Sequence, residues 1–481
     1  MLWLVARAAV QSMTIDEADT YLAFVAPPFA TQWSAAANNQ LLNSLLMRLF
    51  TGIFGAGHLA LRAPALIGAA IYIAAAYRIC ALLTPDAVLQ WGTFVGLVYN
   101  PFVMDYLVAA RGYSLALGFW LAAVAILAHG AAESRISPKL CVCASVYAGL
   151  SFVANFSFTF VDAATILALW WSPGRRDPKL LARCVLPGMG ITLLLAGSML
   201  FKWPSGQLTA GAHAVGEAAR SILASSLYEP NDFLVSPPLY KLLRNFGKWL
   251  PVALAAACLF QLVLMLRKRR ELPKFPVALA AVAAGILAIA AAAHWLMFRL
   301  ADIPLPEDRT AVFFAPLIVV LAAALAAVPV PSRVLKIVLL ATGAYFLCCL
   351  RLTYIRDWKF DADTEDLYWV LAYYNHQYGV QDVMTEWRYV AALNYYRTRS
   401  GQESLHEFEG VIPPFRGEQD VNVLYYPDEQ DFIRAHGLKI VYYGRRSDAV
   451  VAIRPEVERR AAGAAYRGGR AGPGERVQAP D

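Results

Sequence analysis

The sequence predicts an all-α polytopic membrane bundle followed by a small C-terminal α/β domain. Of its 481 residues, 58% are hydrophobic and 16% are charged, whereas soluble domains carry about 25% charged residues. Long apolar runs recur through the first part of the chain. Residues 1–353 hold 26 Lys and Arg with 15 Asp and Glu, and the remaining residues hold 16 and 20. These observations exclude an ordinary soluble globule and place the domain boundary near residue 353.

Ten apolar runs are candidate membrane spans, because about 20 apolar residues cover the hydrocarbon core of a bilayer. The runs are 63–77, 87–104, 112–132, 140–155, 158–171, 184–201, 249–266, 275–298, 310–332 and 337–350. The continuous stretch 140–171 is divided at Asn155, since one crossing of that length would need a strong tilt. Met1–Met13 is apolar but too short to cross, and we interpret it as the outer end of an eleventh span that begins upstream. Ten or eleven transmembrane helices are therefore expected.

Positive charge predicts the orientation of these spans. One set of alternate loops holds 14 Lys and Arg, whereas the opposite short loops hold Arg111, Arg299 and Arg309. Basic loops face the cytoplasm, so the protein is expected in the cell (inner) membrane with residues 14–57 and everything after 353 on the outer side. This loop asymmetry accounts for the net charge of +7, which argues against nucleic acid as a partner.

Ionisable residues gather in three short outer loops: Asp16-Glu17, Asp105 with Arg111, and Glu307-Asp308-Arg309. Charged side chains at a membrane boundary are costly unless they are paired or functional. The three clusters predict a polar cavity that opens outward. The alternative is that these loops are simply polar.

The first outer loop, 14–57, contains a predicted interfacial helix over 39–54. Its apolar residues form a stripe along one helical face, and they are Leu41, Leu42, Leu45, Leu46, Leu49, Phe50, Ile53 and Phe54. Such a helix lies in the membrane interface with its stripe in lipid or on the bundle, and Asn38 or Asn39 is the expected N-cap. A short core helix without a special role fits the same pattern.

Several outer-face motifs resemble those of the GT-C fold glycosyltransferases. They are, in chain order, Asp16-Glu17, NNQLLNSLL at 38–46, LRAP at 61–64, Asn100-Pro101, ARGY at 110–113 and LPEDRT at 305–310. The resemblance is closest to the bacterial branch related to protein O-mannosyltransferases and to the lipid A aminoarabinose transferase, and it covers the chain to about residue 455. Relatives often have His where Gln40 stands.

The resemblance implies a donor sugar on a polyprenyl phosphate and an acceptor hydroxyl on a lipid, a glycan or a protein. It makes Asp16 the candidate general base, with Glu17 beside it and Asp105 as a second catalytic acid. The candidate ligands of the phosphate or the substrates are Arg309, Arg111, Tyr113, Asn39, Glu307 and Asp308. The alternatives are structural: Arg111 as an anchor that pairs with Asp105, and Arg309 paired with Glu307 or Asp308. A divalent cation near the acids fits the chemistry, but the sequence does not demand one.

Two other functions compete with this hypothesis: a lipid or glycolipid transporter, and a glycan polymerase or ligase. A transporter favours internal repeats and broken helices at the midplane, and the sequence has no clear repeat. A polymerase or ligase favours a large outer loop between spans, whereas the longest soluble segment here is terminal. There is no nucleotide-binding motif of the GxGxxG or P-loop kind.

The soluble domain is expected over 354–458, with a disordered tail over 459–481 that is rich in Ala, Gly, Arg and Pro. Residues 363–379, 386–399 and 428–436 have helical spacing. Runs of β-branched and aromatic residues at 421–426, 438–443 and 449–454 predict strands. Four Tyr-Tyr pairs (373–374, 395–396, 425–426 and 442–443) suit either a strand core or the stacking of sugar rings, and the core is favoured.

Overall fold

The computed structural model describes residues 1–84, 86–133, 136–171, 178–204, 206–207, 211–267, 272–329, 333–415 and 419–459. Almost all of the predicted disordered tail, 459–481, and many of the basic loop residues lie outside these ranges. The chain forms two compact units, which are treated separately here. The first consists of Met1–Val10 and Ala23–Thr353, and the second of Gln11–Leu22 with the chain from Tyr354 onward.

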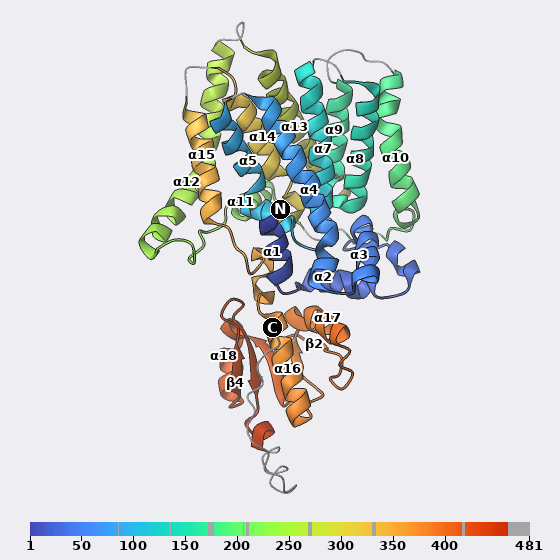
Figure 1. Cartoon of the computed structure of the whole chain (residues 1–481), viewed down its shortest axis with the longest axis vertical. Coiled ribbons are helices and arrows are strands. Elements are labelled where there is room, and N and C mark those ends of the chain that lie inside the picture. Colours follow the sequence, from blue (N-terminus) through green and yellow to red (C-terminus); the bar gives the residue numbers. More distant parts are fainter. Residues whose placement is uncertain are drawn as a thin grey trace. The chain divides into compact units, whose positions relative to one another are not determined.

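The first unit is a bundle of helices (Figure 1), as expected. Every predicted span contains a helix, and these are α4 (His58–Leu83), α5 (Ala87–Val98), α7 (Tyr113–Glu133), α8 (Pro138–Ala154), α9 (Thr159–Trp171), α10 (Pro178–Leu200), α12 (Pro237–Arg267), α13 (Lys274–Ala301), α14 (Phe314–Ala326) and α15 (Val334–Cys348). Among the described residues, six helical segments are long and apolar enough to cross a membrane. The remaining spans are shorter apolar helices of 10–17 residues. The chain is thus a multi-pass membrane protein.

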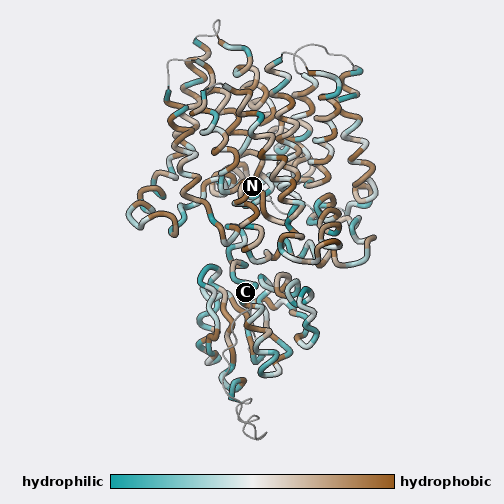
Figure 2. The backbone as a smooth tube through the Cα atoms, in the orientation of Figure 1, coloured by the Kyte–Doolittle hydropathy of each residue, from teal (hydrophilic) through white to brown (hydrophobic). Residues whose placement is uncertain are grey.

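Hydropathy separates the bundle helices from their ends. Apolar residues run along the helices of the first unit, and hydrophilic residues gather at the helix ends and in the loops (Figure 2). Small residues allow close contacts between neighbouring helices: a Cβ on Gly118 would lie 2.5 Å from the carbonyl oxygen of Gly68, and one on Gly149 would lie 2.5 Å from that of Gly188. Without a hydrophobic force between helices in lipid, such backbone contacts stabilise the bundle.

The predicted break at Asn155 is confirmed, whereas the predicted span 87–104 is wrong at its outer end. Asn155 ends α8, and its side chain accepts a hydrogen bond from the backbone N–H of Ser157 in the 3₁₀ turn η3 (Phe156–Phe158). Helix α5 ends at Val98, and a separate helix α6 (Pro101–Tyr106) begins after Asn100. The Asn100 side chain caps α6, so the Asn-Pro step starts a new helix and does not continue the span.

The shorter elements of the first unit include α1 (Leu2–Val10), η2 (Phe29–Trp33), α3 (Leu41–Phe54), α11 (Val215–Ser226) and η4 (Asp308–Ala311). Helix α3 matches the predicted interfacial helix but begins at Leu41, with Gln40 as its N-cap in place of Asn38 or Asn39. Its buried residues include Asn43 and Ser44. The apolar stripe is divided: Leu41 is buried in a core cluster, against which Leu42 and Leu45 pack, whereas Leu49, Ile53 and Phe54 near the end of the helix are exposed.

The second unit is a small α/β domain. Its helices are α2 (Ile15–Thr20), η5 (Arg356–Asp361), α16 (Thr364–Tyr378), η6 (Trp387–Tyr389), α17 (Val390–Ser400) and α18 (Tyr426–Ala435), and η1 (Tyr21–Val25) follows α2. Its strands are β1 (Met384–Glu386), β2 (Gly410–Val411), β3 (Val421–Tyr425), β4 (Lys439–Tyr443) and β5 (Ala449–Ile453). The three predicted strands are present, and the sequence missed β1 and β2 because they are only three and two residues long.

The five strands form one sheet in the order β2-β1-β3-β5-β4. Strand β1 pairs in parallel with β2 and β3, whereas β3-β5 and β5-β4 are antiparallel. Buried residues of the core include Met384, Leu424 and Val450. Of the tyrosine pairs, Tyr395 and Tyr396 are buried, whereas Tyr373 and Tyr443 are exposed.

Candidate functional site

Asp105 occupies a fully buried helix in the first unit. The side chain of Asn100 accepts hydrogen bonds from the backbone N–H groups of Phe102 and Val103, and Pro101 occupies the first turn, so α6 is capped where it starts. Every residue of α6 is buried, and Asp105 is 2% exposed. A carboxylate in such surroundings is costly without partners.

Two side chains that the sequence did not single out meet Asp105. Nη2 of Arg7 lies 2.5 Å from Oδ1 of Asp105, and the hydroxyl of Tyr228 donates to Oδ2 at 2.7 Å. Arg7 comes from α1 and is itself 1% exposed. The signal for Arg7 was present in the sequence, because it is a charge inside an apolar segment, and such residues are functional candidates by default. Tyr228 carried no such signal, since 123 residues separate it from Asp105.

The segment that carries Tyr228 connects Asp105 with the loop of Arg309. Its helix α11 contacts the turn η4 through serine hydroxyls: Ser221 and Ser225 donate to Oδ1 of Asp308 at 2.7 and 2.6 Å. The backbone of Ala212 pairs with that of Leu305. Two of the three predicted clusters, those of Asp105 and of 307–309, therefore lie against one segment of the first unit.

Tyr228 is held firmly at its backbone and its ring. Its carbonyl oxygen accepts a hydrogen bond from the Tyr345 hydroxyl at 2.7 Å. The guanidinium of Arg351 lies 5.5 Å from the centroid of its ring, within the range of a cation–π contact. These contacts fix the phenol that faces Asp105.

Glu307 and Asp308, the two acids of the 307–309 loop, have contacts that shape this loop. The Asp308 carboxylate bonds the two serines, and Asp308 has a positive φ of 41°. Glu307 forms a capping box with Thr310, which starts the 3₁₀ turn. Both acids thus have structural contacts in this loop.

Arg111 and Tyr113 lie in a buried turn that leads into α7. Nδ2 of Asn43 donates to the carbonyl oxygen of Ala110 at 3.1 Å, and the backbone N–H of Gly112 donates to the side chain of Gln40. A Cβ on Gly112 would lie 1.9 Å from a backbone oxygen of α8, so this turn requires glycine. Gln40 therefore holds the Arg111 turn through the Gly112 N–H, which is a structural role.

Asn39 is fully buried and serves the loop before α3. Its Nδ2 donates to the carbonyl oxygens of Gln32 and Ser34, both at 2.8 Å. Tyr113 is also buried, and its ring centroid lies 4.9 Å from that of Tyr106 on α6. Tyr113 thus joins the Arg111 turn to the helix of Asp105, whereas the Asn39 amide is engaged by backbone.

Asp16 and Glu17 belong to the second unit, although the sequence placed them with the membrane part. They lie on the short helix α2, which Thr14 caps. Thr14 Oγ1 accepts from the Glu17 N–H at 3.3 Å, and Glu17 Oε2 accepts from the Thr14 N–H at 3.0 Å. This capping box could have been read from the spacing of Thr14 and Glu17. It gives Glu17, which is fully buried, a structural role and leaves Asp16 partly exposed.

Helix α2 is fastened to the C-terminal part of the second unit by backbone contacts. Oδ2 of Asp361 accepts from the Ile15 N–H at 2.7 Å, and the Tyr396 hydroxyl accepts from the Met13 N–H at 2.8 Å. The Tyr21 ring meets the Tyr395 ring edge to face at 5.6 Å. These contacts are the physical reason that residues 11–22 group with a domain more than 300 residues away.

Asp361 is a buried carboxyl group beside two others. Burial raises its pKa well above the usual range, and the neighbouring charges of Asp16 and Glu17 raise it further. The hydrogen bonds from Ile15 and Thr364 act in the opposite direction. Asp361 anchors the start of α2 through its hydrogen bond with the Ile15 N–H.

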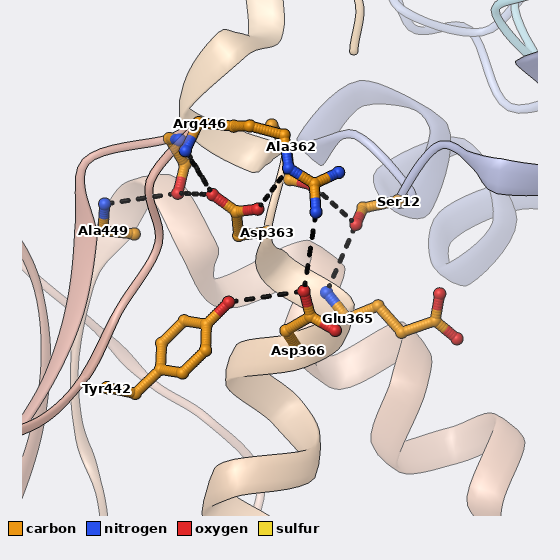
Figure 3. A network of polar contacts seen from close by, with 9 residues as sticks. Ser12, Ala362, Asp363, Glu365, Asp366, Tyr442, Arg446 and Ala449 are labelled. Carbon is orange, nitrogen blue, oxygen red and sulfur yellow. Dashed lines mark hydrogen bonds and ion pairs between the residues drawn. The ribbon is translucent and has the colours of Figure 1, made fainter. Parts of the chain in front are cut away.

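A second buried aspartate, Asp363, has a different task in the same region (Figure 3). Its Oδ2 accepts from the backbone N–H groups of Arg446 and Ser447 and from the Ser447 hydroxyl, and Nε of Arg446 lies 3.0 Å from Oδ1. Ser12 bonds nearby, donating to the carbonyl oxygen of Ala362 at 3.1 Å. Asp363 therefore clamps the β4–β5 turn to the start of α16.

Two solved structures of ArnT, the lipid A aminoarabinose transferase, resemble this chain. Both are from Cupriavidus metallidurans, one in the apo state and one bound to undecaprenyl phosphate. Each is 12% identical and covers 94% of this chain and 95% of its own, with TM-scores of 0.39 and 0.41. Neither likeness assigns an activity to this chain.

No family model matches the chain, and no curated protein matches it. Within the described ranges, no group of three or more His, Cys, Asp or Glu side chains is placed to hold a metal ion.

Proposed function

We propose that this protein is an integral-membrane glycosyltransferase. It moves a sugar from a polyprenyl-phosphate donor to an acceptor hydroxyl, and the reaction takes place on the outer face of the membrane. The C-terminal domain lies on that same face, as the distribution of Lys and Arg in the loops predicts. The acceptor is a lipid, a glycan or a protein.

The observation that carries the proposal is a set of buried charges in an apolar bundle. Arg7, Arg62, Arg111 and Asp105 of the first unit are each at most 4% exposed. Burying an arginine among apolar helices costs roughly 2.5–3.5 kcal/mol on insertion scales, so three buried arginines in the first unit point to function. The guanidinium fork matches the oxygens of a phosphate.

The reaction needs a base for the acceptor and positive charge for the leaving group. Asp16 takes the proton of the acceptor hydroxyl while that oxygen attacks the anomeric carbon. The bond between this carbon and the phosphate oxygen breaks, and its electron pair stays on the phosphate. The products are the glycosylated acceptor and the polyprenyl phosphate, and Asp16 holds the proton. Among the acids of α2, Asp16 suits this task because Glu17 is occupied by the capping box.

Arg309 and Arg111 stabilise the charge that develops on the phosphate. Asp105 contacts Arg7 and Tyr228 and orients these groups. Glu307 and Asp308 shape the loop that presents Arg309. Tyr113 and Asn39 form walls of the cavity that holds the substrates. Holding the acceptor hydroxyl in line with the anomeric carbon and the leaving phosphate supplies much of the rate acceleration.

Transfer in membranes tests the proposal. Membranes that contain the full chain are supplied with labelled polyprenyl phosphates that carry a hexose, a pentose or an amino sugar, and both labelled product and released polyprenyl phosphate are measured. Asp16→Asn should lower transfer by about a hundredfold or more, within the range that a general base contributes. Transfer that survives this substitution unchanged overturns the role of Asp16.

The matched control is Asp19→Asn on the same helix. Asp19 is partly exposed like Asp16, so the same chemical change on α2 should leave transfer within about twofold of the wild type, as a surface substitution does. Equal losses in both variants would mean that α2 is disturbed as a whole and would contradict a specific role for Asp16.

A further inference from the structure

The carboxyl edge of the parallel strands in the second unit has the topology of a binding site. From β1 the chain runs through α17 to β2 on one side, whereas from β3 it runs through α18 toward β4 on the other side. The loops after β1 and β3 therefore leave the sheet in opposite directions. Ligands of open α/β sheets bind at such switch points, outside the carboxyl ends of the strands.

Charged and aromatic side chains meet at this edge. Glu386 ends β1, and its Oε2 accepts from the backbone N–H of Tyr425, which ends β3, at 2.8 Å. Arg388 follows, with Nε 3.1 Å from Oε1 of Glu386 and Nη2 2.9 Å from Oδ2 of Asp428. Its guanidinium lies 4.6 Å from the centroid of the Tyr425 ring. The residues of both loops thus form one polar network around Arg388.

An exposed aromatic ring lies beside this network. Trp387 is 47% exposed, and Arg388 lies 5.9 Å from the centroid of its ring. A tryptophan that is left half in water offers a flat apolar face next to hydrogen-bonding groups. A sugar ring has the complementary surface, with an apolar C–H face and a rim of hydroxyls that bond planar polar side chains.

A buried tyrosine hydroxyl next to Arg388 in the sequence has no hydrogen-bond partner in the part of the chain that the structure describes. Tyr389 follows Arg388 and is fully buried, and its hydroxyl oxygen has no hydrogen-bond partner among the described residues. Buried polar groups without a partner are rare and call for an explanation. Burial raises the pKa of Tyr389, and the charges of Glu386 and Asp361 raise it further.

We propose that the edge formed by Glu386, Trp387, Arg388, Tyr425 and Asp428 binds a carbohydrate. Glu386, Asp428 and neighbouring Glu429 outnumber the single arginine, so the site favours neutral or amine-bearing sugars over sugar acids. Burial raises the pKa of both Glu386 and Glu429, which adds proton donors suited to hydroxyl oxygens as the pH falls. The site lies within the second unit and does not depend on the transfer reaction.

Saturation-transfer NMR on the full chain in lipid nanodiscs tests the site. The probes are chitotriose, the trimer of glucosamine and the trimer of galacturonic acid. The first two should bind, and the galacturonic acid trimer should not. Absence of binding by both chitotriose and the glucosamine trimer at millimolar concentration overturns the proposal, as does equal binding of all three probes.

Two variants and a matched control separate this site from nonspecific stacking. Trp387→Ala should weaken binding of chitotriose about tenfold, the loss expected for one good aromatic contact, and Asp428→Asn should weaken the glucosamine trimer more than chitotriose. Trp369→Ala removes an equally exposed tryptophan, 55% exposed on α16, and should leave binding unchanged. Equal affinities of Trp387→Ala and wild type overturn the proposal. Binding should persist in Asp16→Asn, so a failure here is distinct from a failure of the transferase assignment.

Discussion

Asp105 in the first unit and Asp361 in the second are both almost completely buried, at 2% and 1% exposure, yet the chain stabilises them differently. Asp105 meets the guanidinium of Arg7 and the hydroxyl of Tyr228. Asp361 receives a backbone N–H from Ile15 and a hydroxyl from Thr364. Asp105 is paired with a charged group within the bundle, whereas Asp361 has neutral hydrogen-bond donors, and burial raises its pKa.

The largest expected effect is the loss of the charge on Asp105. Asp105→Asn leaves the Arg7 guanidinium buried without its carboxylate, and breaking a buried pair on one side costs about 3–5 kcal/mol of unfolding free energy. Denaturant titration of the purified chain in nanodiscs measures this loss. Replacing both residues together, Arg7→Met with Asp105→Leu, should recover most of it. A double variant as unstable as Asp105→Asn would contradict the pairing.

The next effect concerns the second partner of Asp105. Tyr228→Phe removes a hydrogen bond to a charged group and keeps the ring beside Arg351, so the unfolding free energy should fall by about 1.5–3 kcal/mol. The same titration measures it. Tyr240→Phe is the control, because the Tyr240 hydroxyl bonds an exposed carboxylate, Glu229, and its loss should change stability by under about 0.5 kcal/mol.

For Asp361 the expected effect is local. Asp361→Ala frees the Ile15 N–H, and amide hydrogen exchange over residues 11–22 should become about tenfold faster, equivalent to the loss of one hydrogen bond. Asp363→Ala is the control two residues away: it releases the β4–β5 turn and should accelerate exchange at 444–449 while leaving 11–22 protected. If both variants loosen 11–22 equally, the anchoring role of Asp361 is wrong.

The smallest effect is a dependence on pH. Because the pKa of Asp361 is raised in the folded state above the usual 3.8, the folded protein binds this proton more tightly than the unfolded chain. The resulting stability is complete below the usual pKa and is lost as the pH rises through the folded value. Protection of residues 11–22, corrected for intrinsic exchange, should therefore increase on acidification from neutral pH. Asp361→Asn should remove this dependence, and an unchanged slope would contradict it.

Hydropathy was sufficient for the bundle, because length and apolar composition alone determine whether a helix can span a bilayer. Helices occupy every predicted run, and the break at Asn155 was visible because one crossing of 140–171 would be too long. The end of α5 was missed although its signal was present. Asn100-Pro101 is a cap followed by a first-turn proline, and the apolar residues after it concealed the new helix.

The candidate site was harder to predict from the sequence, because the residues in contact there are far apart along the chain. Arg7 and Tyr228 lie 98 and 123 residues from Asp105, and no local periodicity connects them. The grouping of α2 with the C-terminal domain depends on a backbone N–H at Ile15 and a side chain at Asp361, which a hydrophobic pattern cannot detect. The capping box of Glu17 was local and therefore readable.

The bond between Ile15 and Asp361 also imposes an order on biogenesis. It joins residues 346 positions apart, so a ribosome must synthesise the chain through Asp361, past the end of the first unit, before α2 acquires this anchor. Every helix of the bundle after α1 is made in the interval. Helix α2 is thus made early and reaches this native contact late, which keeps Asp16 from its final setting until Asp361 has been synthesised.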